Sequence, residues 1–119
     1  MAEVRLIGNL KGRLYYLDSP LLDFEIRDRE LVKATDLSGG KLYPWEMATQ
    51  GVSYGSFVRF FDRRTMQEGC MYYFEHLRAL GMERMDFDRY IRLNNGNNHL
   101  DNYWVRFEDG GARCFAELK

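Results

Sequence analysis

The sequence predicts an α+β fold: an N-terminal antiparallel β-meander, then two to three helices, then a C-terminal β-hairpin. In the first third of the chain, short runs alternate apolar and polar residues and are separated by tight turns, which is typical of strands. In the middle, apolar residues recur at helical spacing. Because the strands precede the helices instead of alternating with them, the order favours α+β over α/β.

The β-rich part is expected to cover residues 1–43. The third run alternates most cleanly, with Leu22, Phe24 and Ile26 on one face. The loop DLSGGK then leads into the helical part, and it is not a domain linker because short strands need a partner layer. The expected strands are EVRLIG, RLYYLDS, LLDFEIR and ELVKAT, with NLKG as the loop between the first two.

Residues 44–95 are predicted to be helical. Pro44 and Gly51 suit the start and end of a short first turn, and Ser53 is a candidate N-cap for the next helix. That helix presents one apolar face, formed by Tyr54, Phe57, Val58 and Phe61.

The following helix is predicted from a capping box in which Thr65 and Glu68 satisfy each other's backbone amides. Gly81 is expected to end it in a left-handed conformation. Its buried stripe is expected to consist of Cys70, Tyr73, Phe74, Leu77 and Leu80.

A shorter helix is predicted from its cap, Asp86, to about Leu93, where residues 94–96 stop it. Phe87, Tyr90 and Ile91 are its expected buried residues. A hairpin over residues 101–118, turning at Asp109, Gly110 and Gly111, would then close a single domain spanning residues 1–119.

Charge and composition bear on the class of protein. The chain has 17 basic and 18 acidic residues and a net charge of −1, so no nucleic-acid partner is expected. The charged N-terminus and the absence of a long apolar run predict neither a signal peptide nor a membrane segment. Cys70 and Cys114 belong to no CxxC pair and are expected to be reduced and buried, which favours the cytoplasm.

No catalytic motif is visible in the sequence. His76 and His99 are the only histidines, and there is no GxSxG motif, phosphate-binding loop or zinc-like spacing. Asp86, Asp88 and Asp101 could form an acid/base set, but helix caps and turns explain Asp86 and Asp101 more simply. We therefore expect no enzyme, no metal and no cofactor.

The segment GNNHLDNYWV contains the best candidate binding residues. The side chains of Asn97, Asn98 and His99 suit either a ligand or a tight turn. Asp101 can accept the amide of Tyr103 in an Asx turn, which favours the structural interpretation. Tyr103 and Trp104 alternate, so one is expected in the core while the other is an outward-facing interface anchor. Arg63 and Arg64 are further candidates, although a salt-bridged helical surface also explains them.

Residues 42–105 resemble the N-terminal region of HipA-like Ser/Thr protein kinases of Firmicutes. The similarity is carried by LYPWEM, FFDRRTMQEG, ALGM and GNNHLDNYWV, in which Asp101, Tyr103 and Trp104 match the family's structural signature. Two features depart from the family: residues 97–100 replace its usual Leu-Ser-Leu-Asn run, and the kinase lobes do not follow. The resemblance implies a freestanding leader region without phosphotransfer activity.

The expected function is that of a non-enzymatic, cytoplasmic protein-interaction module. By analogy with related toxin–antitoxin systems, the resemblance implies a regulator or antitoxin of a separately encoded HipA-like kinase. Two alternatives stay open: an inhibitor or accessory protein from a mobile element or phage that acts on another host protein, and an unrecognised enzyme that uses the His99 loop.

Overall fold

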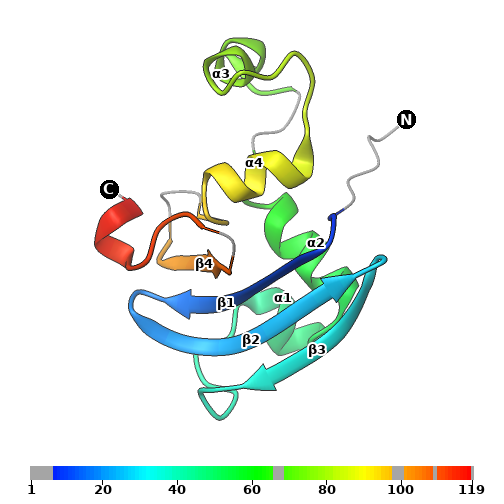
Figure 1. Cartoon of the computed structure of the whole chain (residues 1–119), viewed down its shortest axis with the longest axis vertical. Helices are drawn as coiled ribbons and strands as arrows, with labels where there is room; N and C mark the ends of the chain where they lie inside the picture. Colours follow the sequence, from blue (N-terminus) through cyan, green and yellow to red (C-terminus); the bar gives the residue numbers. More distant parts are fainter. Residues whose placement is uncertain (1–6, 66–68, 98–100, 109, 119) are drawn as a thin grey trace.

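The fold is known from a computed structural model, which describes residues 7–65, 69–97, 101–108 and 110–118. Four antiparallel strands form one sheet in the order β3-β2-β1-β4. Figure 1 shows helices α1 and α2 behind the sheet, α4 beside them and α3 farthest from the strands. The elements are β1 (Leu10–Tyr16), β2 (Ser19–Arg27), β3 (Glu30–Asp36), α1 (Trp45–Gln50), α2 (Tyr54–Asp62), α3 (Tyr73–Ala79), α4 (Phe87–Leu93), β4 (Tyr103–Phe107) and the 3₁₀ helix η1 (Phe115–Leu118).

The predicted α+β class with an N-terminal meander is confirmed. Strands β1, β2 and β3 follow one another through two-residue turns. At the second turn, Asp28 and Arg29 both have positive φ, 52° and 63°, as a tight hairpin with the normal strand twist requires. The strand boundaries at the N-terminus differ from the prediction.

The expected loop NLKG is largely part of β1. Leu10 pairs with Ile26 and Gly12 with Phe24, so the chain is already extended there. Most of the first expected strand falls in residues 1–6, outside the described residues. The meander of the described structure therefore has three strands, and the fourth strand of the sheet comes from the C-terminal part of the chain.

Of the two strands expected in the C-terminal hairpin, only the first is present. Strand β4 pairs with β1 over residues 103–107 instead of with the segment that follows it. After an isolated bridge between Phe107 and Gly110, the chain turns away through Gly110 and Gly111, whose φ angles are 140° and 92°. The second expected strand is replaced by an irregular segment and by η1, where the backbone amide of Phe115 donates to Asp18 Oδ1 at 2.9 Å.

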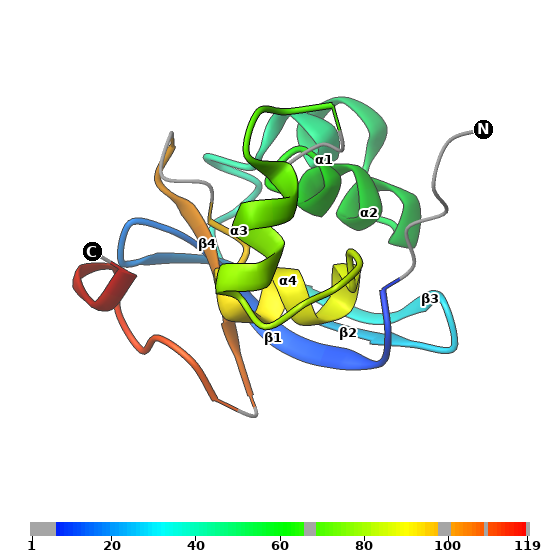
Figure 2. The ribbon, with the colours of Figure 1, turned by 90° about the horizontal axis from the view of Figure 1, so that it is seen from above.

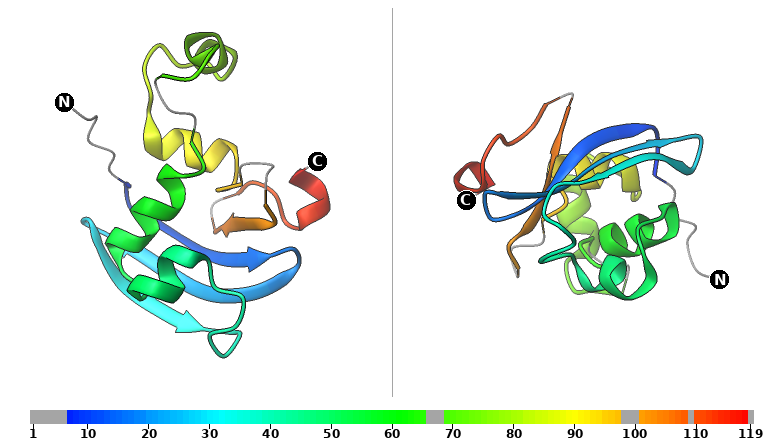
Figure 3. Two further views of the ribbon diagram at one scale, coloured as in Figure 1. Left: turned by 180° about the vertical axis from the view of Figure 1, so that it is seen from behind. Right: turned by 90° about the horizontal axis from the view of Figure 1, so that it is seen from below.

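The main core lies between the sheet and α2. Leu22, Phe24 and Ile26 are buried on one face, as the alternation predicted. The Phe24 and Phe57 rings pack with centroids 4.2 Å apart, which joins the two layers. Figure 3 shows from behind and from below how the helices cover this face of the curved sheet. Phe60 is also fully buried although the predicted face omitted it.

Helix α2 begins as predicted at Ser53, whose hydroxyl accepts the amide of Ser56 in a capping box. Helix α4 also begins as predicted, with the Asp86 carboxylate accepting the amide of Arg89 at 3.2 Å. The expected buried residues of α4, which are Phe87, Tyr90 and Ile91, are buried.

Helix α3 departs most from the prediction. It begins at Tyr73, not just after Thr65, whose hydroxyl donates to the Asp62 carbonyl. Glu68, the other half of the expected capping box, lies outside the described residues. Tyr73 and Leu77 are buried, whereas Phe74 and Cys70 are exposed, contrary to expectation.

The physical reason is the small size of the layer against which α3 packs. Its buried cluster consists of Tyr73, Leu77, Met82 and Tyr90, and α4 supplies only the last of these. Seven residues of helix against one neighbouring helix can bury only a narrow stripe. Gly81, with φ at 78°, ends this region in the left-handed conformation that was predicted.

Within the part of the chain that the structure describes, no helix combines the length and the apolar character needed to cross a bilayer.

Candidate functional site

The asparagine-rich segment after α4 runs along the free edge of β4. The Val105 amide donates to the Asn95 carbonyl at 2.7 Å, and Asn95 Nδ2 donates to the Val105 carbonyl at 3.2 Å. Asn95 thus acts on the edge of β4 as a neighbouring strand would. Its Oδ1 also accepts the amide of Ala112 at 3.5 Å, which links β4 to the returning chain.

Asn97 continues the same pairing. Its Nδ2 donates to the Tyr103 carbonyl at 2.8 Å and to the Asp101 carbonyl at 3.3 Å, and the residue is buried. Gly96 between them has φ at 63°, and a Cβ there would come within 2.8 Å of the Phe61 ring. These contacts give Asn97 a structural role. Asn98 and His99, the other two candidates from this segment, lie outside the described residues.

Asp101 has two structural partners. Its Oδ1 accepts the amide of Tyr103 at 3.1 Å, which is the Asx turn that the sequence predicted. Its Oδ2 forms an ion pair with Arg64 Nη2, a contact that the sequence did not predict. Asp101 therefore ties the start of β4 to the end of α2.

Arg64 is buried, with 6% of its surface exposed. Its Nη1 donates to the Phe60 carbonyl at 3.3 Å, and its guanidinium lies over the Phe60 ring at 3.9 Å. Desolvation lowers the pKa of Arg64, while the charge of Asp101 opposes that shift. Through these contacts, the buried Arg64 holds the end of α2 against the start of β4.

Arg63 points away from Arg64, toward α1. Its guanidinium lies 5.2 Å from the Trp45 ring centroid and 3.9 Å from the carboxylate of Glu46. The two guanidiniums therefore have different partners, but Arg63 and Arg64 both line one hollow of about 630 Å³, which Asn97 also lines.

Tyr103 and Trp104 lie on opposite faces of the sheet. Tyr103 packs edge-on against Phe60 and donates its hydroxyl to the Leu42 carbonyl at 2.7 Å. Trp104 stacks on Tyr15 with centroids 4.7 Å apart, and its indole donates to the Leu17 carbonyl. Trp104 is fully buried and Tyr103 half-buried, so the expected outward-facing anchor is absent from this pair.

Of the remaining chemically versatile side chains, His76 and Cys70 line the same hollow as Arg64, whereas Cys114 does not. His76 Nε2 lies 2.9 Å from the hydroxyl of Tyr90, between α3 and α4. Cys70 and Cys114 are free thiols. Among the described residues, no three His, Cys, Asp or Glu side chains gather in a way that could hold a metal ion.

The clearest exposed feature is one that sequence reasoning assigned to the core. Met71, Tyr72 and Phe74 lie at the start of α3 and are 76%, 68% and 55% exposed. We call these three residues the α3 patch. A signal for it was present in the run of adjacent aromatics at 72–74, because three consecutive helical positions cannot share one buried stripe.

The comparisons with known proteins identify no relative: no family model, no curated protein and no solved structure matches the chain.

Proposed function

We propose that the protein is a non-enzymatic interaction module that binds a protein partner through the α3 patch. The observation that carries this proposal is the exposure of Met71, Tyr72 and Phe74 within four consecutive positions. Exposed apolar residues scattered singly need no explanation, but contiguous ones mark interaction sites. Methionine and aromatic residues are also the types enriched at interface centres.

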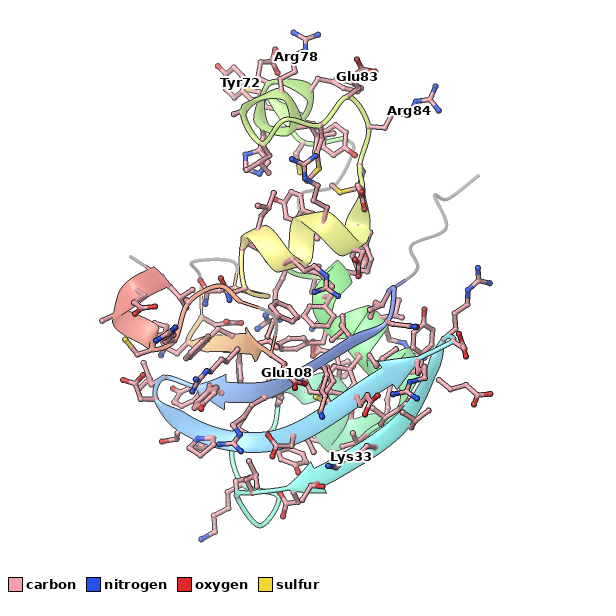
Figure 4. All side chains as sticks on the ribbon, viewed as in Figure 1. Lys33, Tyr72, Arg78, Glu83, Arg84 and Glu108 are labelled. Carbon is pink, nitrogen blue, oxygen red and sulfur yellow. The ribbon has the colours of Figure 1, made fainter. Side chains whose placement is uncertain are left out.

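The surroundings of the α3 patch suit an interface. Figure 4 shows Tyr72 at the far end of the molecule, with Arg78, Glu83 and Arg84 on the same end. Charged residues of both signs around an apolar centre are the usual arrangement of a protein–protein contact. Helix α3 lies at the end of the molecule away from the sheet (Figure 1), and Figure 2, seen from above, shows it in front of the other helices, so a partner can reach it without disturbing the sheet.

A non-enzymatic role is supported by the structural contacts that three of the candidate catalytic groups make. Asp101 pairs with Arg64, and Asp86 caps α4. His76 contacts the Tyr90 hydroxyl.

We propose a separately encoded, cytoplasmic HipA-like kinase as the partner, with this protein as its regulator or antitoxin. The support is the resemblance of residues 42–105 to the leader region of such kinases. In that resemblance, Asp101, Tyr103 and Trp104 are signature residues, and here all three make contacts that fix the start of β4.

The test is a binding measurement with the purified HipA-like kinase of the same genome. We expect the wild-type protein to bind, and Tyr72→Ser/Phe74→Ser to weaken binding by about 30-fold or more, as for a central hot spot. Val32→Ser is the matched control, because Val32 is 52% exposed on β3, away from α3. It should bind like wild type, and circular dichroism should show that all variants are folded.

Two results would overturn separate parts of the proposal. Failure of the folded wild-type protein to bind the kinase would exclude that partner. A different protein, identified by affinity capture and mass spectrometry, would then favour the mobile-element inhibitor. Equal binding by the double variant and by wild type would exclude the α3 patch as the contact surface.

A further inference from the structure

The face of the sheet opposite α1 and α2, which we call the outer face, carries a concentration of positive charge. A hollow of about 510 Å³ lies between this face and the segment after β4. Its described lining contains five cations against two carboxylates, although the whole chain has a net charge of −1. We call this site the basic hollow, and its cations are Lys11, Arg13, Lys33, Arg106 and Arg113.

Two of the five cations are neutralised within the structure. Arg13 makes a two-point contact with Asp23, at 2.6 and 3.0 Å. Lys11 lies 3.4 Å from Glu108. The two carboxylates of the lining, Asp23 and Glu108, are thus already paired with cations of β1.

The other three cations, Lys33, Arg106 and Arg113, form no ion pair with another described residue. Arg106 stands directly opposite Arg13 in the β1–β4 register. Like charges at directly opposed positions destabilise a sheet, and Asp23 is occupied by Arg13. An anion bound over the hollow would offset this repulsion between Arg13 and Arg106. The arrangement of charges therefore favours the binding of an anion.

The spread of these cations indicates the shape of the ligand. Lys33 is on β3 and Arg106 on β4, at opposite sides of the four-stranded sheet. At about 4.8 Å between neighbouring strands, three spacings separate them by roughly 14 Å. A single phosphate cannot reach both, whereas an extended polyanion can. Alternate side chains of an extended peptide, about 6.8 Å apart, suit such a row.

The aromatic residues of the outer face argue against a nucleic-acid strand. Single-stranded nucleic acids bind by stacking bases on exposed aromatic rings. Here Tyr15 and Trp104 stack on each other and are buried. The negative net charge also provides little of the general attraction on which nucleic-acid binders depend.

We propose that the basic hollow binds an extended acidic segment of a protein partner. This inference rests on the proposed function as an interaction module, but it concerns a second surface. In Figure 4, Lys33 and Glu108 lie on the sheet, far from Tyr72 at the α3 end. A partner with an acidic tail or loop would engage both surfaces at once, which raises affinity without any new contact at either one.

The test uses a fluorescein-labelled peptide of six glutamates, with binding followed by fluorescence anisotropy at about 20 mM and about 150 mM salt. We expect Arg106→Gln and Lys33→Gln each to raise the Kd about three- to fivefold at low salt, with smaller effects at the higher salt. Glu108→Gln should lower the Kd, because it removes a competing carboxylate and releases Lys11. Arg84→Gln, an exposed cation of the α3 end, is the matched control and should leave the Kd unchanged.

Three outcomes would overturn the inference. The first is no binding of the peptide to wild type at low salt and millimolar concentration. The second is an equal loss of affinity in Arg84→Gln, which would show attraction by overall charge alone. The third is tighter binding of a six-nucleotide single-stranded DNA with the same dependence on Arg106 and Lys33. None of these outcomes involves the α3 patch, so failure here is distinguishable from failure of the kinase-binding test.

Discussion

Helices α2 and α3 both carry aromatic residues that were expected in a buried stripe, yet the structure buries those of α2 more completely. On α2, Phe57 and Phe61 are fully buried, and Phe57 packs against Phe24 of the sheet. On α3, Phe74 is exposed, although a buried stripe was expected to include it. The difference is the partner layer: α2 lies on a four-stranded sheet, while α3 lies on one short helix. An apolar pattern predicts that a helix forms, but only its neighbours determine how much of it is buried.

The largest effect expected from this comparison is at Phe57. Phe57→Ala should lower the free energy of unfolding by about 3–5 kcal/mol, because it removes a fully buried ring and leaves a cavity between the sheet and α2. Chemical denaturation monitored by circular dichroism would measure it. A loss below about 1 kcal/mol would mean that α2 does not hold the main core together.

The next largest effect is at Asp101. Asp101→Ala should cost about 3 kcal/mol, because it leaves the buried Arg64 without its counter-ion and removes the cap on the Tyr103 amide. The Asx turn alone would account for only about 1 kcal/mol, so the measured value separates the two contributions.

A double variant provides the control. Arg64→Met/Asp101→Ala should be more stable than Asp101→Ala alone, because no uncompensated buried charge remains. If the double variant is instead less stable by the full sum of the single effects, the ion pair does not couple α2 to β4.

These cases show which contacts of the structure could be predicted from the sequence. Local signals were sufficient for the Ser53 and Asp86 caps and for the hydrogen bond from the Tyr103 amide to Asp101, because each depends on residues two or three positions apart. The pairing of Arg64 with Asp101 joins residues 37 positions apart and left no local trace.

The same distinction explains the sheet and the asparagine segment. Strand β4 was predicted as a strand, but its pairing with β1 depends on which distant edge is available. Asn95 was predicted to help stop α4 in a region of positive φ, and Asn97 to suit either a tight turn or a ligand. Their side chains cover the edge of β4 because the fold places that edge beside them. No short stretch of sequence encodes this placement.

A smaller effect is expected on the outer face of the sheet, where the ion pair is partly exposed. Arg13 holds the pKa of Asp23 below its usual value, aided by Lys33 and Lys11. The unfolded chain therefore binds a proton at Asp23 at a higher pH than the native protein does. This contribution is complete above the ordinary aspartate pKa of about 3.9 and is lost as the pH falls through the lower native value.

Asp23→Asn should accordingly reduce stability at neutral pH by about 1 kcal/mol or less, as for other partly exposed pairs. Its stability should also depend less steeply on pH below about 4. Urea denaturation at a series of pH values from 2 to 7 would measure both. Parallel curves for the variant and wild type would show that Asp23 gains nothing from its cationic neighbours.

The smallest effect returns to the comparison of the two helices. Phe74→Ala should change the free energy of unfolding by no more than about 0.5 kcal/mol, because the ring is 55% exposed and its loss opens no enclosed cavity. Leu77→Ala, one turn further along α3, is the matched control, since Leu77 is buried against Tyr73 and Tyr90 and should cost at least about 2 kcal/mol. A cost for Phe74→Ala equal to that of Leu77→Ala would place Phe74 in the core and remove the α3 patch. A negligible cost in stability, together with a loss of partner binding, would mean that Phe74 contributes to a binding surface and not to the core.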